Sequence, residues 1–62
     1  MRLICPKEAA TLLGVSVRTA QRLMRQGEIA ACKIGKLWRT QAEDVAAYRA
    51  RAYERYRRER RT

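Results

Sequence analysis

The 62-residue sequence predicts a mostly α-helical fold with one small β-hairpin. Three observations carry this prediction. Apolar residues recur twice with helical spacing within residues 6–26, and a glycine follows each run. Two β-prone runs then flank Gly35-Lys36, and a helix-start pattern begins at Thr40. A chain of this length forms one domain with a small core.

The first helix is expected to begin near Pro6, because proline is well tolerated at the first helical position. Glu8 in the first turn complements the helix dipole. Gly14 ends the helix, since glycine adopts the left-handed conformation without a Cβ clash. We expect the packed face of this helix to consist of Ala9, Leu12 and Leu13.

A second helix is expected between Ser16, a strong N-cap residue, and Gly27. Its packed face repeats the same spacing, in Ala20, Leu23 and Met24. A different face carries the arginines Arg18, Arg22 and Arg25. Two capped helices with a glycine-containing turn between them form a helix-turn-helix unit. A plain helical hairpin without a nucleic-acid role remains an alternative at this point.

Residues 29–34 and 37–39 read as the two strands of a hairpin. Glycine at the first position of the two-residue turn favours type II′. Ile34 and Trp38 are the expected inward anchors, and we favour a packing role for Trp38 over stacking on a base. The hairpin also carries three positive charges, on Lys33, Lys36 and Arg39.

Thr40 and Glu43 fit a capping box, with Thr40 as the N-cap of a third helix. The face expected to pack on the domain consists of Val45, Tyr48, Ala52 and Tyr56. Tyr53 lies off this face, so we expect it to be exposed.

Residues 49–62 contain seven Arg and two Glu, a net charge of +5. We therefore divide the chain into a domain of residues 1–48 and a basic helical extension of residues 49–62, whose last residues, 57–62, are expected to fray. Three roles for the extension stay open: phosphate contact, docking of a protein partner such as an integrase or a second copy, and solubility. The dominance of arginine on a helix favours phosphate contact.

The whole chain has 15 Lys and Arg residues against 6 Asp and Glu residues, a formal net charge of +9. Twelve of the basic residues are Arg, whose planar fork of donors suits phosphates and the edge of guanine. This charge indicates a polyanionic partner. A basic surface that serves only solubility is the alternative.

The sequence favours a binding module over an enzyme. The chain is too short to enclose a pocket of about 300 Å³ and keep a core beneath it. It has no His and no Gly-rich phosphate loop, so we expect neither catalysis nor a cofactor. No apolar run approaches the roughly 18–20 residues that span a bilayer, and no secretory leader is present, so we expect no membrane contact.

The two cysteines, Cys5 and Cys32, lack metal-binding spacing. We expect free thiols that pack as small apolar residues in a reducing cytosol. A disulfide between them is the alternative.

Together these residues resemble the small excisionase-type domains, which are winged helix-turn-helix proteins related to the DNA-binding half of MerR-type regulators. The resemblance covers about residues 3–48. The matching positions are Pro6, Glu8, Ala9, Ala10, residues 12–16, Arg18, Thr19, Arg22, Leu23, Gly27, Ile29, Ala31, residues 33–35, Trp38 and Arg39.

The resemblance implies a winged helix-turn-helix of three helices and a two-stranded wing. Its second helix would enter the major groove of duplex DNA and its wing would contact the adjacent backbone or minor groove. The residues expected to face the major groove are Ser16, Val17, Arg18, Thr19, Gln21 and Arg22. The wing residues are Lys33, Gly35, Lys36 and Arg39. Arg25, near the end of the helix, is expected to contact the backbone.

The role that the resemblance implies is that of an excisionase. Such a protein assembles with neighbouring copies of itself on DNA, bends the DNA, and directs an integrase toward excisive recombination in the cytoplasm, at the nucleoid. The runner-up is a small transcriptional regulator of a phage or mobile element. An RNA-binding or protein-binding adaptor is the alternative from another class. The lack of an exposed aromatic platform disfavours RNA.

Overall fold

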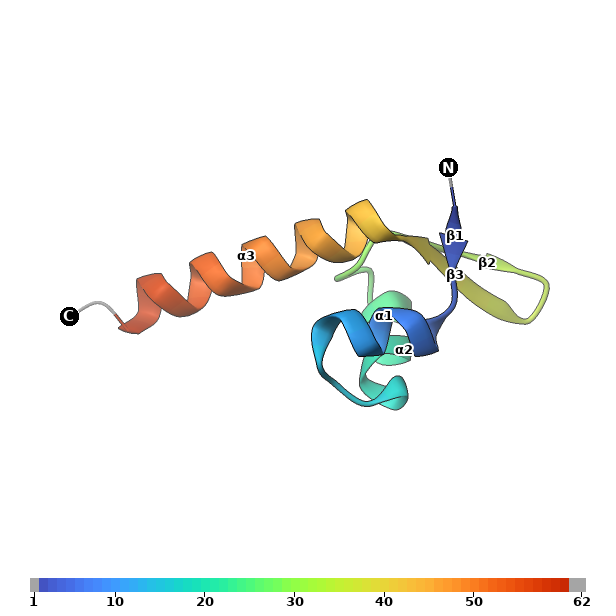
Figure 1. Ribbon diagram of the computed structural model, residues 1–62, viewed down its shortest axis with the longest axis horizontal. Coiled ribbons are helices and arrows are strands. Elements are labelled where there is room, and N and C mark those ends of the chain that lie inside the picture. The colour runs from blue at the N-terminus through green and yellow to red at the C-terminus, as the bar shows by residue number, and fades with distance from the viewer. Residues whose placement is uncertain (1, 61–62) are drawn as a thin grey trace.

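The computed structural model describes residues 2–60 as three helices and a three-stranded antiparallel sheet (Figure 1). This architecture confirms the predicted mostly helical, winged fold class. In chain order the elements are β1 (Leu3–Ile4), α1 (Pro6–Leu13), α2 (Val17–Arg25), β2 (Ala31–Ile34), β3 (Leu37–Gln41) and α3 (Ala42–Arg60).

The third strand of the sheet, β1, is absent from the sequence prediction. It pairs antiparallel with β3, with Leu3 opposite Gln41 and Ile4 opposite Thr40, so that β3 is the central strand. Two residues are too few to display the alternation that identifies a strand. The strand nevertheless matters, because it places Ile4, which is 3% exposed, in the core.

Gly14 ends α1 as predicted, with a φ of +73°. The Val15 N–H donates to the Ala10 carbonyl at 3.0 Å, and the Gly14 N–H donates to the Thr11 carbonyl at 3.3 Å. This pair of bonds satisfies two carbonyls at the helix end in the Schellman pattern. The chain is thereby turned sharply toward α2.

The boundaries of α2 are also confirmed. The Ser16 hydroxyl accepts from the Thr19 N–H at 3.1 Å and so caps the helix. At the other end Gly27 has a φ of +80°, and the Glu28 N–H donates to the Leu23 carbonyl at 2.9 Å. Both helices of the unit therefore have the ends that local sequence indicates.

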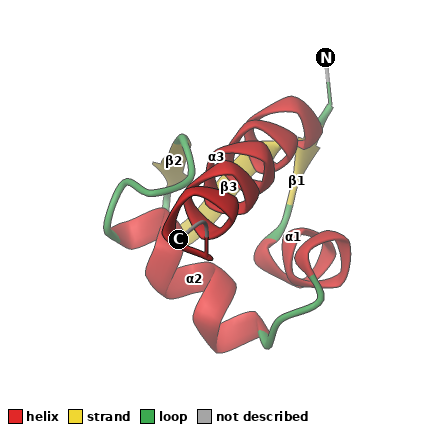
Figure 2. Ribbon diagram, turned by 90° about the vertical axis from the view of Figure 1, so that its left-hand side faces the viewer, coloured by secondary structure: helices red, strands yellow, loops and turns green. Residues whose placement is uncertain are grey.

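The core lies where α1, α2, the sheet and the start of α3 meet (Figure 2). Its buried apolar residues are Ile4, Ala9, Ala10, Ala20, Met24, Ile29 and Val45. Around them pack the partly buried Leu13, Leu23, Ala31, Trp38 and Tyr48. The predicted anchoring role of Trp38 is confirmed, whereas Ile29 is a core residue that precedes β2 instead of forming part of it.

Three predicted packing residues are exposed instead: Leu12 (49%), Ile34 (53%) and Tyr56 (56%). Leu12 lies on the border between α1 and α3, next to Ala42 and Val45, where neither helix covers it. Ile34 is the last residue of β2 before the turn, beyond the reach of the helices. Tyr56 lies on the part of α3 that extends beyond the rest of the domain. Helical spacing identifies one face of a helix but not how far along it a partner extends.

The capping box predicted at Thr40 is wrong. Thr40 belongs to β3, is 2% exposed, and its hydroxyl donates to the Ala30 carbonyl at 2.7 Å. The hydroxyl is therefore engaged inside the fold, and α3 begins two residues later, at Ala42. Glu43 and Asp44 still lie in the first turn of α3, where their charges complement the helix dipole.

Helix α3 has 19 residues and runs far beyond the rest of the domain (Figure 1). Val45 is buried and Tyr48 and Ala52 are half-buried, whereas Tyr53 is 63% exposed, as predicted. Residues 48 and 49 lie within one continuous helix. The proposed division between a domain of residues 1–48 and an extension of residues 49–62 is therefore a division of function only. Fraying was expected for residues 57–62, but residues 57–60 are helical; residues 61 and 62 lie outside the described residues.

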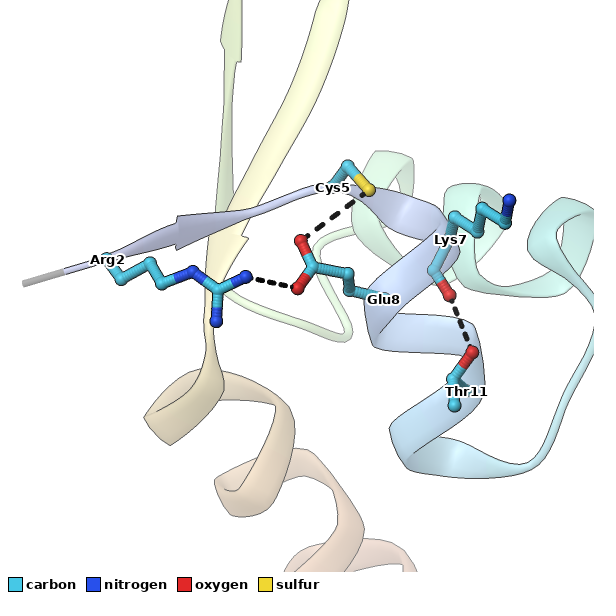
Figure 3. A network of polar contacts seen from close by, with 5 residues as sticks. All are labelled: Arg2, Cys5, Lys7, Glu8 and Thr11. Carbon is cyan, nitrogen blue, oxygen red and sulfur yellow. Dashed lines mark hydrogen bonds and ion pairs between the residues drawn. The ribbon is translucent and has the colours of Figure 1, made fainter.

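The start of the chain is tied to α1 through Glu8 (Figure 3). The Arg2 guanidinium lies 2.6 Å from one carboxylate oxygen of Glu8, and the Cys5 thiol donates to the other at 3.8 Å. Cys5 and Cys32 are both free thiols. Cys32 is exposed, contrary to the packed role expected for it, because it lies opposite Arg39 on the outer face of the sheet.

Replacing Gly14 tests the cost of the left-handed turn by itself, because a Cβ added there meets nothing within 4 Å. We expect Gly14→Ala to lower the free energy of unfolding by about 1 kcal/mol, and Gly14→Asn to lower it by less, since asparagine tolerates this conformation better. Urea unfolding at equilibrium measures both changes. Equal stability of the three chains would contradict this account of the turn.

Candidate nucleic-acid interface

The outward face of α2 carries three arginines. Ala20 and Met24, at 0% and 2% exposure, hold the opposite face of this helix in the core. At 3.6 residues per turn, Arg18, Arg22 and Arg25 all point about 140–200° away from Ala20. All three are exposed, and Figure 2 shows α2 at the edge of the molecule, with α1 and α3 on its inner side. The structure thus brings the three guanidinium groups to one open surface.

The other predicted α2 residues divide into two groups. Val17 and Gln21 are exposed beside the arginines. The Ser16 hydroxyl, by contrast, caps the helix and also donates to the Thr19 hydroxyl at 3.0 Å. Thr19 is half-buried. Ser16 and Thr19 therefore serve first to build the start of α2, and their hydroxyls are already engaged with each other.

The hairpin turn has the geometry that glycine permits. Gly35 has a φ of +64°, no non-glycine residue among residues 2–60 has a positive φ, and Ile34 pairs with Leu37 across the turn. These features agree with the predicted type II′ turn. Lys33 and Lys36 are both exposed.

Lys33 and Trp38 pair across the hairpin on the same face of the sheet. The Lys33 ammonium lies 6.0 Å from the centroid of the Trp38 ring, at the outer limit of a cation–π contact. Trp38 is half-buried against the core. The lysine is thereby held over the side of the hairpin that faces the helices.

Arg39 does not join this lysine. It pairs with Cys32, one position along from the Lys33–Trp38 pair, so it lies on the opposite face of the sheet. The residue is half-buried, and its guanidinium donates to the Trp38 carbonyl at 2.8 Å. Strand alternation alone would have separated Arg39 from Lys33 in the sequence.

One contact that sequence reasoning missed links α3 to the end of α2. The Arg51 guanidinium donates to the Glu28 carbonyl at 2.9 Å, across 23 positions of the chain. No local pattern predicts such a bond, because every residue has a backbone carbonyl and the sequence does not indicate which one a distant side chain will contact.

Other kinds of site find little support in the part of the chain that is described. Among residues 2–60, no group of three or more His, Cys, Asp or Glu residues is arranged to hold a metal ion. Within the same range no helix has the length and apolar character needed to cross a membrane.

Three curated relatives were found, an uncharacterized protein of Mycobacterium bovis and two of Mycobacterium tuberculosis strains. Each is 51% identical to the chain over 43 residues, which is 69% of this chain. The match spans only 38% of the length of each relative. No solved structure gives a significant match.

Residues 6–53 match a family described as the helix-turn-helix domain, which includes excisionase-like DNA-binding proteins. The match covers both helices of the unit, the hairpin and α3 as far as Tyr53. The chain belongs to the helix-turn-helix domain family.

Proposed function

We propose that this chain binds duplex DNA sequence-specifically, with α2 in the major groove and the β2–β3 hairpin against the adjacent backbone. The observation that carries the proposal is the exposed arginine face of α2, opposite the buried Ala20 and Met24. Membership of a family of DNA-binding domains supports it.

The dimensions of α2 suit this role. An α-helix with its side chains is about 10–12 Å across, close to the roughly 12 Å width of the major groove. Arg18 and Arg22 are one turn apart, about 6 Å along the axis, so both reach into the groove when the start of α2 enters it. A bidentate contact from arginine to guanine fits both side chains. Arg25 lies farther along and is assigned to the backbone.

The hairpin supplies the second contact in this arrangement. Lys33 and Lys36 are exposed on a turn that Gly35 keeps tight, and no acidic residue occurs between Ala30 and Ala42. Ammonium groups act as point charges on phosphates and carry no sequence preference. The helix therefore reads sequence, and the hairpin positions it.

For the biological role we propose an excisionase that bends DNA beside an integrase and assembles with neighbouring copies in the cytoplasm, at the nucleoid. The resemblance to excisionase-type domains supports this role. A small transcriptional regulator is the second candidate, because the same fold and the same arginine face serve both. The relatives are more than twice as long as the matched segment, so roles of their other parts are not transferred.

Replacing Arg18 or Arg22 with Ala should weaken binding to a selected duplex by about 5- to 150-fold each, the equivalent of about 1–3 kcal/mol for a lost bidentate contact. Fluorescence anisotropy with a duplex selected by the wild-type chain from a randomised library measures this loss. Lys7→Ala, at an exposed position of α1, is the matched control. Equal losses on selected and scrambled duplexes would reduce both arginines to backbone contacts.

Lys36 and Arg39 of the hairpin are expected to contribute differently to the salt dependence of binding. The wild-type chain should show a slope of log K against log salt of about −5 to −6, as expected for five to seven neutralised phosphates. Lys36→Gln should make the slope less negative by about 0.9. Arg39→Gln should change it less, because the Arg39 guanidinium is engaged with the Trp38 carbonyl. A flat salt dependence of the wild-type chain would contradict the electrostatic model altogether.

Bending of the bound DNA separates the two candidate roles. An excisionase is expected to bend its site, so complexes on circularly permuted fragments should migrate differently according to the position of the site. Equal migration of all fragments would favour the regulator.

A further inference from the structure

We propose that the distal arm of α3, defined as residues 53–59, carries on its Arg55 and Arg58 side a second phosphate-binding surface that contacts DNA flanking the recognition site. This inference rests on the proposed function and extends it, because it places a contact on the side of α2 opposite the hairpin. The ligand chemistry is the sugar-phosphate backbone of duplex DNA, read without regard to sequence.

The distal arm has no place in the core. Val45 is 2% exposed near the start of α3, but Tyr53 and Tyr56 are 63% and 56% exposed. At 1.5 Å per residue, the 19 residues of α3 extend about 28 Å, so more than a turn and a half lies beyond the last half-buried residue, Ala52. The side chains of the arm are thus exposed, and α3 packs on the domain only through its N-terminal part.

The rotation of α3 about its own axis is fixed by contacts on two sides. Arg51 bonds to the Glu28 carbonyl, three residues after the end of α2, so this side of α3 faces the end of α2. Arg49 lines a depression together with Leu12 of α1, so its side of α3 faces α1. The two arginines therefore mark opposite sides of the helix.

Arg55 and Arg58 continue the side marked by Arg51. They follow it at positions i+4 and i+7, which places all three within about 60° around the helix axis. All three are exposed. The side of α3 marked by Arg51 starts beside the end of α2, whose last turn carries Arg22 and Arg25.

We call Arg51, Arg55 and Arg58 the arginine stripe. Its position in the molecule gives it a different target from that of α2. The molecule is 45 Å long, and Figure 1 shows the hairpin and the distal arm at opposite ends of this length, with α2 between them. In the view along α3, its C-terminal end projects over α2 and not over α1 (Figure 2). At 3.4 Å per base pair, 45 Å corresponds to about 13 base pairs, more than one helix in a groove covers.

A second copy of the chain is a poorer occupant for this surface. Another copy of the chain carries a formal net charge of +9, with 15 basic residues against 6 acidic ones, and like charges repel. Phosphates offer the opposite charge in a regular array. Charge complementarity therefore commits the distal arm to nucleic acid.

Two double variants with the same loss of charge test the proposal. Arg55→Gln/Arg58→Gln removes the stripe beyond Arg51, and Arg49→Gln/Arg57→Gln removes two arginines from other sides of the same helix. Affinity is measured by anisotropy over a range of salt concentrations. One duplex carries the selected site with about ten flanking base pairs at each end, and a second duplex is trimmed to the site. Circular dichroism checks that both variants keep the helical content of the wild type.

On the long duplex we expect the first variant to make the salt slope less negative by about 1.8, the value for two lost phosphate contacts, with a loss of affinity on the order of tenfold. On the trimmed duplex it should behave as the wild type does. The control variant should stay within about twofold of the wild type on both. The ratio of affinities for selected and scrambled sites should not change in either variant, because Arg18 and Arg22 set it.

Equal losses from the two variants would overturn the proposal, since they would show an effect of net charge without a preferred face. A loss on the trimmed duplex as large as on the long one would also overturn it. These outcomes leave the proposed function intact. That function fails separately, if the wild-type chain shows no specific, salt-dependent binding to any duplex.

Discussion

Strand β3 fixes the positions of all the parts proposed to contact DNA. It pairs with β1 on one side and β2 on the other, and α3 follows it without a loop. Thr40, the last residue but one of β3, lies opposite both Ile4 and Ala31, and its buried hydroxyl donates to the Ala30 carbonyl at 2.7 Å. A buried hydroxyl without a partner costs about 1–3 kcal/mol, so this bond matters in a domain with a small core. The hairpin and α3 extend from opposite ends of β3, which is why they lie on opposite sides of α2.

Small side chains explain why α2 can present arginines to solvent at all. Ala9 on α1 and Ala20 on α2 are both completely buried, and residues of this size let the two helices approach closely. A short helix that buries so narrow a face leaves the rest of its circumference open. Met24 and Ile29 then fill the space between α2 and the sheet. The arginines of α2 therefore have only the outer surface to occupy, and their exposure follows from the packing.

The parts of the fold that local sequence specifies were predicted well, and those that need a distant partner were not. Gly14, Ser16 and Gly27 act within one helical turn, so their roles are visible in the sequence. Thr40 shows the limit: its sequence context fits an N-cap, but the distant Ala30 carbonyl holds it in a strand instead. At the candidate site, helical spacing predicts the arginine face of α2. Strand alternation also predicts that Arg39 and Lys33 lie on opposite faces of the hairpin, once the register is known. The contact of Arg51 with a distant backbone carbonyl could not be predicted.

Acidic residues occupy the first turns of only two of the three helices. Helix α1 has Glu8 in its first turn and α3 has Glu43 and Asp44, so side-chain charges offset the positive ends of both helix dipoles. Helix α2 has no acidic residue in its first turn. Its positive N-terminal end therefore adds to the charge of Arg18 instead of being cancelled. In the proposed complex this end approaches a polyanion, and an acid there would oppose binding. Carboxylates thus stabilise the first turns of α1 and α3, whereas α2, the helix proposed to enter the groove, has none in its first turn.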